Sequence, residues 1–209
     1  MHIILVGANG TIGRGVAERL SKDHEIVSAG RNSGDLRVDI GNEESIAAMY
    51  EAAGDFDALI CCAGQAKFDT LNSLSAADFH LGLHSKLMGQ VNLVRLGKDR
   101  INKEGSFTLT SGMLAWRPVP GCSAVSPVNA GVEAFGRAAA TELKGKPRIN
   151  VVSPIHVKDL PEPMDPETTP TMTPAQTAVA YEVSVLSDID GEVLEARKYA
   201  ILEAKSFKG

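Results

Sequence analysis

The chain has 209 residues, of which 44% are hydrophobic and 22% are charged, and its formal net charge is −5. This length and composition suit one compact domain over residues 1–209 with a sizeable core. The acidic balance and the lack of a basic block exclude nucleic acid as the main ligand, and no apolar run approaches the roughly 18 residues of a membrane span. The sequence enters a strand at once, so no signal peptide is expected. Cys61 and Cys62 on an apolar strand end and Cys122 far along the chain agree with reduced thiols in a cytoplasmic protein.

A short strand, a glycine-rich turn and an amphipathic helix open the chain. The run Ile3–Val6 is apolar and largely β-branched, which is typical of a parallel strand buried on both faces. Apolar or small residues at helical spacing from Ile12 to Leu20 predict the helix. The glycines between them permit a tight turn, the approach of a pyrophosphate and close helix packing, with the helix N-terminus facing the phosphates.

This joint predicts a dinucleotide site, and the alternative is a tight turn in some other α/β protein. The residues predicted to bind the cofactor here are Gly7, Asn9, Gly10, Thr11, Ile12 and Gly13. The sequence lacks a Gly-Lys-Ser/Thr phosphate loop, which disfavours an ATP or flavin site in a similar sheet.

The end of the second predicted strand, Glu25–Ala29, indicates which dinucleotide binds. NAD-specific sites place an acidic side chain near this position to accept a hydrogen bond from the ribose 2′-hydroxyl. The chain has Gly30 and Arg31 there, and an arginine beside Asn32 and Ser33 suits a 2′-phosphate, which a carboxylate would repel. The sequence therefore predicts NADP(H) rather than NAD(H), and the alternative is a solvated loop arginine.

Asp39 follows the apolar residues Leu36 and Val38 and is expected to end a third strand. Its predicted role is to hold the adenine amino group of the cofactor. The alternative is an N-cap for the helix that starts near Glu43.

Strands and helices keep alternating along the rest of the chain. The predicted elements are a helix over 42–53, a strand over 58–61, a long or broken helix over 75–99, a strand over 106–110, a helix over 122–144, a strand over 148–152, a helix over 174–186 and a last strand over 191–201. This alternation predicts an α/β fold, a doubly wound parallel sheet with helices on both faces. The proline-rich stretch Leu160–Pro174 is predicted to be a loop over the carboxyl end of the sheet, where such folds bind ligands.

Five segments form an ordered set along the chain: Gly7–Gly13, Cys61–Gly64, Thr110–Gly112, Ala134–Leu143 and Arg148–Pro154. Together, in order and spacing, they resemble the short-chain dehydrogenase/reductase family over nearly the whole chain. The resemblance implies a single-domain Rossmann fold, a nicotinamide cofactor and a Ser-Tyr-Lys active site supported by an Asn. It also implies cofactor contacts at Ala63, Gly64 and Pro154.

The resemblance is uneven at the active site. Ser111 falls at the substrate-orienting serine, where a hydroxyl can hold a carbonyl oxygen, and the alternative is a serine that caps nearby backbone. Val125 falls at the tyrosine position and Asn129 at the lysine position. Valine cannot exchange a proton, and asparagine cannot supply the charge that lowers the pKa of a phenol, although Asn129 can still bind the nicotinamide ribose. Lys86 takes about the place of the supporting asparagine.

Lys86 is the best substitute for the missing acid. A desolvated ammonium near a cofactor can titrate toward neutrality and give a proton to a developing alkoxide, whereas the plainer alternative is a solvated or paired helix lysine. The tyrosines of the chain, Tyr50, Tyr181 and Tyr199, are not expected near a loop at the right end of the sheet.

The histidines give weaker signals. His80 and His84 stand four residues apart, a spacing that can bind a metal, but no third ligand is evident, so an exposed or interface pair and no metal are expected. His156 falls near the carboxamide end of the cofactor by the family resemblance, where it either faces the substrate or caps a loop.

Two classes of function remain open. The first is an NADP-dependent oxidoreductase acting on a small carbonyl or alcohol with Ser111 and Lys86 as catalytic residues, and the second is a non-catalytic NADP(H)-binding or cofactor-sensing protein. The missing tyrosine and lysine favour the second class, while Ser111 and the proline-rich loop favour the first. Surplus apolar residues on the helices over 78–99 and 126–144 predict a homodimer or homotetramer, the alternative being one core face with exposed alanines.

Overall fold

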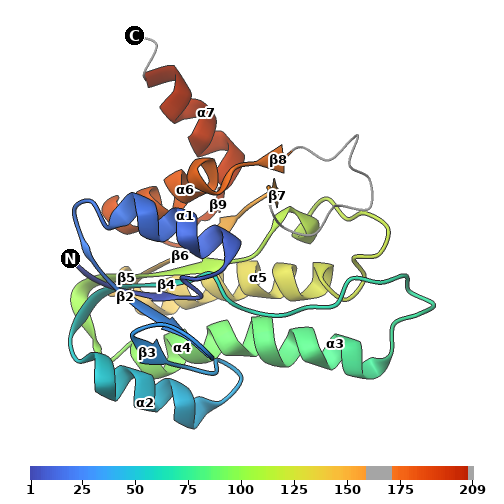
Figure 1. The fold of residues 1–209 in the computed structure, drawn as a ribbon, viewed down its shortest axis with the longest axis horizontal. Coiled ribbons are helices and arrows are strands. Elements are labelled where there is room, and N and C mark those ends of the chain that lie inside the picture. The colour runs from blue at the N-terminus through green and yellow to red at the C-terminus, as the bar shows by residue number, and fades with distance from the viewer. Residues whose placement is uncertain (159–170, 207–209) are drawn as a thin grey trace.

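The computed structural model describes residues 1–158 and 171–206, which are built around a seven-stranded parallel sheet (Figure 1). Its strands are β1 (His2–Val6), β2 (Glu25–Gly30), β3 (Leu36–Arg37), β4 (Phe56–Cys61), β5 (Ile101–Thr110), β6 (Arg148–Ser153) and β9 (Val193–Glu195). They lie in the order β3-β2-β1-β4-β5-β6-β9, and every neighbouring pair is parallel. The predicted doubly wound Rossmann fold is therefore confirmed. A separate short pair joins β7 (His156–Val157) to β8 (Thr171–Met172).

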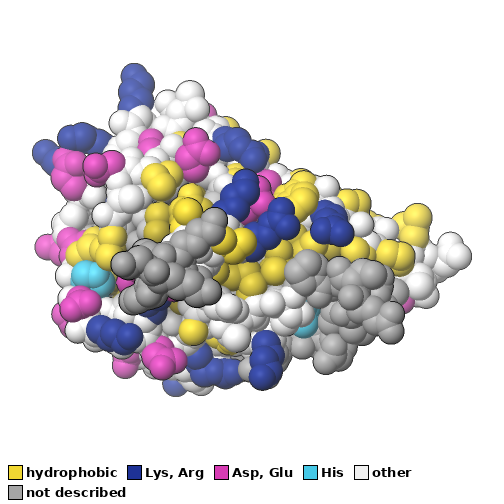
Figure 2. All heavy atoms as spheres, turned by 90° about the horizontal axis from the view of Figure 1, so that it is seen from above, with side chains coloured by type: hydrophobic (Ala, Val, Ile, Leu, Met, Phe, Trp, Pro, Cys, Tyr) yellow, Lys and Arg dark blue, Asp and Glu magenta, His cyan; other side chains and the backbone are white. Residues whose placement is uncertain are grey.

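Helices cover both faces of the sheet. On one face lie α1 (Thr11–Leu20), α6 (Pro174–Leu186) and α7 (Ala196–Ser206) (Figure 1). On the other lie α2 (Glu43–Ala53), α3 (Ala76–Gly82), the π-helix η1 (Leu83–Met88), α4 (Gly89–Gly97) and α5 (Ser126–Leu143), and a short 3-10 helix, η2 (Met113–Ala115), follows β5. The face seen in Figure 2, on the side of α1, α6 and α7, carries hydrophobic side chains beside a group of Lys and Arg side chains.

The alternation of side chains along β1 explains why the core has two layers. Successive side chains of a strand point to opposite faces, so Ile4 and Val6 enter the layer beneath α2, α4 and α5, while Ile3 and Leu5 enter the layer beneath α1 and α6. All four side chains are almost fully buried. The apolar run that predicted a strand buried on both faces thus fills both layers.

The prediction of a last strand over 191–201 is wrong for the residues after Glu195. β9 ends at Glu195, and α7 follows directly. The residues of α7 are mostly alanine, leucine, arginine, lysine and glutamate, which favour a helix, and Lys198 forms an ion pair with Glu195 across one turn. Tyr199 and Ala200 pack against the core from this helix, so their apolar character reflects helix packing and not a strand.

Two predicted helices also differ in detail. The helix expected over 75–99 is broken into α3, η1 and α4, which was one of the two predicted forms. The helix expected over 122–144 begins at Ser126, because residues 122–125 form turns and Pro127 lies in its first turn, where proline is tolerated.

The strand order creates a crevice between the carboxyl ends of β1 and β4. The chain moves outward from β1 to β2 on one side and from β4 to β5 on the other, and ligands of open α/β sheets bind at such a switch point. Of the predicted loop over 160–174, residues 160–170 lie outside the described residues, while Thr173 caps α6 and Pro174 begins it. In the described part of the chain, none of the helices is long and apolar enough to cross a membrane.

Candidate functional site

The turn after β1 depends on space that only glycine leaves. Gly7 has φ +84°, and a Cβ on it would come 3.0 Å from the backbone nitrogen of Ala63, closing the space between β1 and β4. A Cβ on Gly13 would lie 2.1 Å from the carbonyl oxygen of Gly7, so α1 packs closely on the strand end, as predicted. Gly10 is the N-cap of α1, and no side chain among the described residues caps it, which leaves the first-turn amides to an anion.

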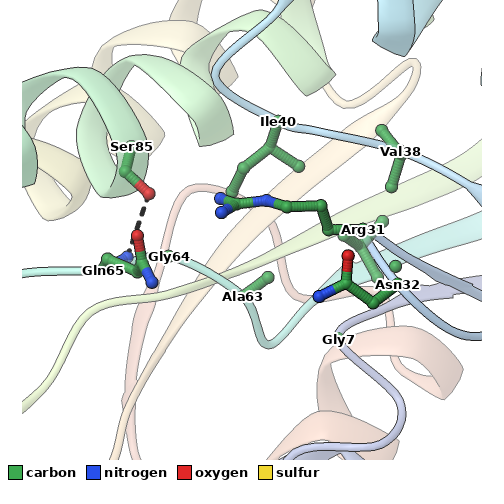
Figure 3. Close-up of a pocket in the computed structure, with 11 residues that line it drawn as sticks. Gly7, Arg31, Asn32, Val38, Ile40, Ala63, Gly64, Gln65 and Ser85 are labelled. Carbon is green, nitrogen blue, oxygen red and sulfur yellow. Dashed lines mark hydrogen bonds between the residues drawn. The ribbon is translucent and has the colours of Figure 1, made fainter.

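A cavity of about 290 Å³ lies at the carboxyl ends of β1, β2 and β4. It is lined by Val6, Gly7, Gly30, Arg31, Asn32, Val38, Ile40, Ala63, Gly64, Gln65 and Ser85. Figure 3 shows the Arg31 side chain reaching across this cavity past Ile40 toward Gln65 and Ser85. The backbone nitrogen of Gln65 donates to Ser85 Oγ at 3.1 Å. The predicted cofactor residues that meet here are Gly7, Arg31, Asn32, Ala63 and Gly64.

Arg31 and Asp39 form a loose ion pair beside this cavity. Arg31 Nε lies 3.5 Å from Asp39 Oδ2, with about half of each side chain exposed, and such an open pair is weak. Both residues also line an adjoining cavity of about 420 Å³. Asp39 accepts a hydrogen bond from the backbone of Gly41, whereas the N-cap of α2 is Asn42, which accepts from the backbone of Ser45. The alternative role of Asp39 as the helix N-cap is therefore wrong.

Asn9 and Ser33 connect the turn after β1 to the loop after β2. Asn9 Nδ2 donates to Ser33 Oγ at 2.7 Å, and Arg14 Nη1 donates to the carbonyl oxygen of Asn9 at 3.0 Å. These bonds hold the two loops together at the side of the predicted phosphate position. Thr11 is the first residue of α1, and Ile12 packs against the core, so the backbone amide of Ile12 and not its side chain is available to a ligand.

The π-helix η1 brings Ser85 and Lys86 to the carboxyl ends of β4 and β5. Such π-helical turns are frequent at functional sites. Gln90 ties the segment to β5, because its amide nitrogen donates to the carbonyl oxygens of Lys86 and Thr110 and its oxygen accepts from the backbone nitrogen of Thr110. A Cβ on Gly64 would come 2.8 Å from Lys86 Cγ, so this glycine leaves room for the lysine stem.

The ammonium group of Lys86 ends among buried groups. Lys86 Nζ donates to the carbonyl oxygen of Ser111 at 3.1 Å. Burial lowers the pKa of Lys86 to about 8, while Cys61 acts weakly in the opposite direction. Among the described residues Lys86 has no acidic partner, and the residue is partly exposed, so its role as a proton donor stays a prediction. A lysine with this pKa can exchange a proton near neutral pH.

Ser111 is held at each of its polar groups. Its backbone nitrogen donates to the carbonyl oxygen of Val152 at 2.9 Å, its carbonyl oxygen accepts from Lys86, and its hydroxyl donates to Glu133 Oε1 at 2.9 Å. The hydroxyl therefore bonds a carboxylate, and the alternative of a serine capping nearby backbone is wrong. Glu133 was not predicted as a site residue, although a charged residue on the apolar stripe of α5, one turn after Asn129, is a signal for it.

Asn129 and Pro154 lie beside Gly112, the residue that follows Ser111. Asn129 is 2% exposed, and its Oδ1 has no hydrogen-bond partner among the described residues. A Cβ on Gly112 would come 3.0 Å from Asn129 Nδ2 and 3.8 Å from the carbonyl oxygen of Pro154. The same carbonyl accepts from the backbone of Met113, which fixes the start of η2. Val125 directly precedes α5 and is buried.

Tyr181 approaches the site from the opposite face of the sheet. Its hydroxyl lies 2.7 Å from Thr110 Oγ1, which also donates to the carbonyl oxygen of Cys61 at 2.6 Å. The expectation that no tyrosine lies near this end of the sheet is therefore wrong for Tyr181. Burial raises the pKa of Tyr181 well above its ordinary value, so this phenol is a poor proton donor at neutral pH.

The histidines His80, His84 and His156 lie on α3, η1 and β7, respectively. His80 and His84 are both exposed, and His84 lines the larger cavity. The described residues contain no group of three or more side chains arranged to bind a metal. His156 Nδ1 lies 3.2 Å from Thr171 Oγ1, between β7 and β8.

The predicted cofactor-binding set lacked six residues that line the smaller cavity: Val6, Gly30, Val38, Ile40, Gln65 and Ser85. Val38 and Ile40 flank Asp39 and line the smaller cavity, and their spacing of two residues was the available signal. Gln65 and Ser85 carry no motif. Their place depends on the loop after β4 and on the π-helical turn, which are set by tertiary packing.

Comparison with known proteins agrees with this architecture. The family model described as enoyl-(acyl carrier protein) reductase matches residues 6–178. A short-chain dehydrogenase/reductase from Acremonium sp is 30% identical over 120 residues, covering 54% of this chain and 45% of that protein, so the match spans about half the length of the relative.

Solved structures are similar over most of the chain. Protein lin1944 from Listeria innocua superposes with a TM-score of 0.88 and 41% identity, covering 93% of this chain and 98% of that chain. A small-chain dehydrogenase in complex with NADPH superposes with a TM-score of 0.83 and 25% identity, covering 97% of this chain and 99% of that chain. By its matched segments and its fold, the chain belongs to the short-chain dehydrogenase/reductase family, whose members are oxidoreductases that use a nicotinamide cofactor.

Proposed function

We propose that the chain binds NADP(H) and moves a hydride between this cofactor and a small carbonyl or alcohol substrate. The observation that carries the proposal is the partly buried Lys86 ammonium, which donates a hydrogen bond to the carbonyl oxygen of Ser111 at the carboxyl ends of β4 and β5. A proton donor in this position is what a hydride transfer to a carbonyl group requires.

The residues of the crevice fit a dinucleotide. Gly7 and Gly10 have no side chains, so a pyrophosphate can approach their backbone and the first-turn amides of α1. Asn129 Oδ1 is a buried acceptor without a partner among the described residues, and a ribose hydroxyl would satisfy it. Asp39, beside the loop after β2, is placed to accept from an adenine amino group.

The cofactor, when bound, supplies or accepts the hydride. Lys86 would donate a hydrogen bond to the substrate oxygen and then the proton that a developing alkoxide needs. Its lowered pKa makes this transfer easier than from an ordinary lysine. Ser111 and Gln90 hold the lysine in place, because Ser111 accepts from its ammonium and Gln90 donates to its backbone carbonyl.

The choice of NADP(H) over NAD(H) rests on Arg31. Its guanidinium reaches across the cavity, and among the described residues it is held only by a weak pair with Asp39, so it can turn to a 2′-phosphate. Gly30 stands where an NAD-specific site would have a carboxylate. The similarity to a small-chain dehydrogenase in complex with NADPH supports the same choice.

A panel of aldehydes and ketones, scored by oxidation of NADPH, tests this function. Lys86→Met should lower the turnover by roughly a hundredfold, the usual scale for the loss of a positioned acid. Ser111→Ala should lower it by roughly tenfold, because it removes one hydrogen-bonding group that orients the substrate. The affinity for NADPH should change little, because neither side chain lines the cavity at the phosphate turn. Variants that keep the full rate would refute the assigned roles.

A non-catalytic, cofactor-sensing protein is the second candidate. It is favoured by Val125, a buried valine at the start of α5 where the family resemblance places a phenol. The same panel separates the two candidates. Tight NADPH binding without turnover of any carbonyl compound would favour the cofactor-sensing function over the oxidoreductase function.

A further inference from the structure

The buried stripe of α5 carries a carboxylate that the proposed hydride transfer does not use. Asn129 and Glu133 lie one turn apart on this stripe, and Glu133 is only 7% exposed. Burying a carboxylate is costly unless hydrogen bonds and charge compensate it. A carboxylate at this buried position therefore indicates that Glu133 has a role toward the residues it contacts.

Glu133 has one partner on each oxygen. Oε1 accepts from Ser111 Oγ at 2.9 Å, and Oε2 lies 3.6 Å from Arg137 Nη2 on the next turn of α5. This second contact is an ion pair with the exposed guanidinium of Arg137. An ionised carboxylate accepts hydrogen bonds and donates none.

This contact decides the direction of hydrogen bonding at Ser111. A serine hydroxyl has one proton, and here that proton points to Glu133, so only lone pairs remain for a ligand. The Ser111 carbonyl already accepts from Lys86, and Asn129 Oδ1, which has no partner in the described part of the chain, is a second acceptor. The site therefore offers two acceptors, Ser111 Oγ and Asn129 Oδ1, beside the ammonium of Lys86.

We propose that Glu133 makes Ser111 a hydrogen-bond acceptor, so that the site selects carbonyl substrates with a hydroxyl group on the neighbouring carbon. The inference rests on the proposed function, because it places the substrate at Ser111 and Lys86. Lys86 takes the carbonyl oxygen, and Ser111 takes the proton of the hydroxyl group. Glu133 acts through Ser111 and is a positioning residue.

Two ketones that differ in one donor test the selectivity. 3-Hydroxy-2-butanone carries the hydroxyl group, and 3-methoxy-2-butanone keeps the neighbouring oxygen but lacks its proton. With NADPH, the unmutated protein should have a kcat/KM at least about tenfold higher for the hydroxy ketone, the scale of one buried hydrogen bond. Equal values for the two ketones would overturn the proposal.

Glu133→Gln separates positioning from a structural role. The glutamine amide can donate to Ser111 as well as accept from it, so the preference should fall to within about threefold, while kcat/KM for the methoxy ketone stays within about threefold of the unmutated value. Glu142→Gln makes the same chemical change at an exposed position of α5 and should keep the full preference. An equal loss on both ketones in Glu133→Gln would show that Glu133 only supports the fold.

Neutron diffraction from deuterium-exchanged crystals of the unmutated protein locates the deuteron of the Ser111 hydroxyl directly. The expected result is a deuteron between Ser111 Oγ and Glu133 Oε1. A deuteron turned away from Glu133, or one carried by the carboxyl group, overturns the proposal whatever the activity. Turnover of neither ketone by protein that binds NADPH refutes the substrate class, and failure on the wider carbonyl panel also refutes the proposed function.

Discussion

Arg31 concentrates the choice of cofactor in one side chain. It is the cation that reaches across the smaller cavity, and its pair with Asp39 is open to solvent. Arg31→Ala should erase most of the preference for NADPH over NADH, a loss of roughly tenfold to a hundredfold in affinity, because a charge-assisted hydrogen bond contributes about 1.5 to 3 kcal/mol. Calorimetric titration of the variant with both cofactors measures this loss.

Asp39→Asn is the matched control for Arg31. It removes the negative partner of the guanidinium and keeps the guanidinium itself, so the preference for NADPH should persist or increase. An Arg31→Ala protein that still prefers NADPH as strongly as the unmutated chain would refute the role of this arginine.

Lys86 should make stability depend on pH in a defined direction. Its pKa is about 8 in the folded chain, against an ordinary value of 10.5. Between these values the unfolded chain holds a proton that the folded chain has lost, so the free energy of unfolding rises with pH across this window. Below about pH 8 both states are protonated, and the folded state then carries the full cost of the buried charge.

Lys86→Met provides the comparison, because methionine does not titrate. The variant should gain most stability relative to the unmutated protein below about pH 8 and lose that advantage as the pH approaches 10.5, as followed by urea denaturation. Carbonyl reduction by the unmutated protein should fall as the pH rises through about 8, since the acid form is lost. A stability difference that is constant with pH would contradict the lowered pKa.

At the scale of elements, substitutions at two glycines of the first βα unit distinguish the effect on helix packing from the effect on cofactor binding. A Cβ on Gly15 would lie 2.7 Å from the backbone of Pro174, at the contact of α1 with α6. Gly15→Ala should therefore lower the free energy of unfolding by about 1 to 2 kcal/mol, because overpacking outweighs the better helix propensity of alanine. Its affinity for NADPH should stay within about threefold of the unmutated value.

Gly10→Ala should show the opposite pattern. A Cβ there meets only the carbonyl oxygen of Gly7, at 3.3 Å, so stability should change by less than about 1 kcal/mol. The methyl group would stand where the pyrophosphate approaches, so NADPH affinity should fall at least about tenfold. Thermal denaturation and calorimetry on both variants check the pair, and unchanged affinity in Gly10→Ala would contradict the placement of the phosphates.

The first βα unit could be predicted from the sequence because its determinants are local. The apolar run of β1, the glycines and the periodic helix lie within 20 residues and agree with one another. The prediction for the segment after β9 was wrong because its conformation is decided by tertiary packing and not by local residues. A short edge strand passes directly into α7, and the apolar residues Tyr199 and Ala200 fit a strand as readily as a helix until the tertiary packing decides.

The candidate site was predictable only where it follows a strand end. Gly7, Ala63 and Ser111 each come directly or almost directly after a strand of the parallel sheet, so their convergence follows from topology. The hydrogen-bond partner of the Ser111 hydroxyl was harder to predict from the sequence. Glu133 lies 22 residues later on a helix, and the register of this helix against β5 is defined only in the folded chain.

At the scale of the whole molecule, the surface formed by α3 and η1 carries several exposed apolar side chains. On α3 and η1, Leu81, Leu83 and Met88 are about 40% exposed, on the helices that the sequence predicted to form an oligomer contact. We expect a homodimer or homotetramer through this surface, and Leu83→Glu with Met88→Glu should reduce the mass in light scattering to that of one chain. An unmutated protein that is already monomeric at micromolar concentration would contradict the assembly.

The central claim is that the crevice between β1 and β4 binds NADP(H) in preference to NAD(H). The most direct test is calorimetric titration of the unmutated protein with NADPH and, under the same conditions, with NADH. Binding of NADPH at least about tenfold tighter than that of NADH is the predicted result, because only the 2′-phosphate can engage Arg31. Equal affinities, or tighter binding of NADH, would contradict it.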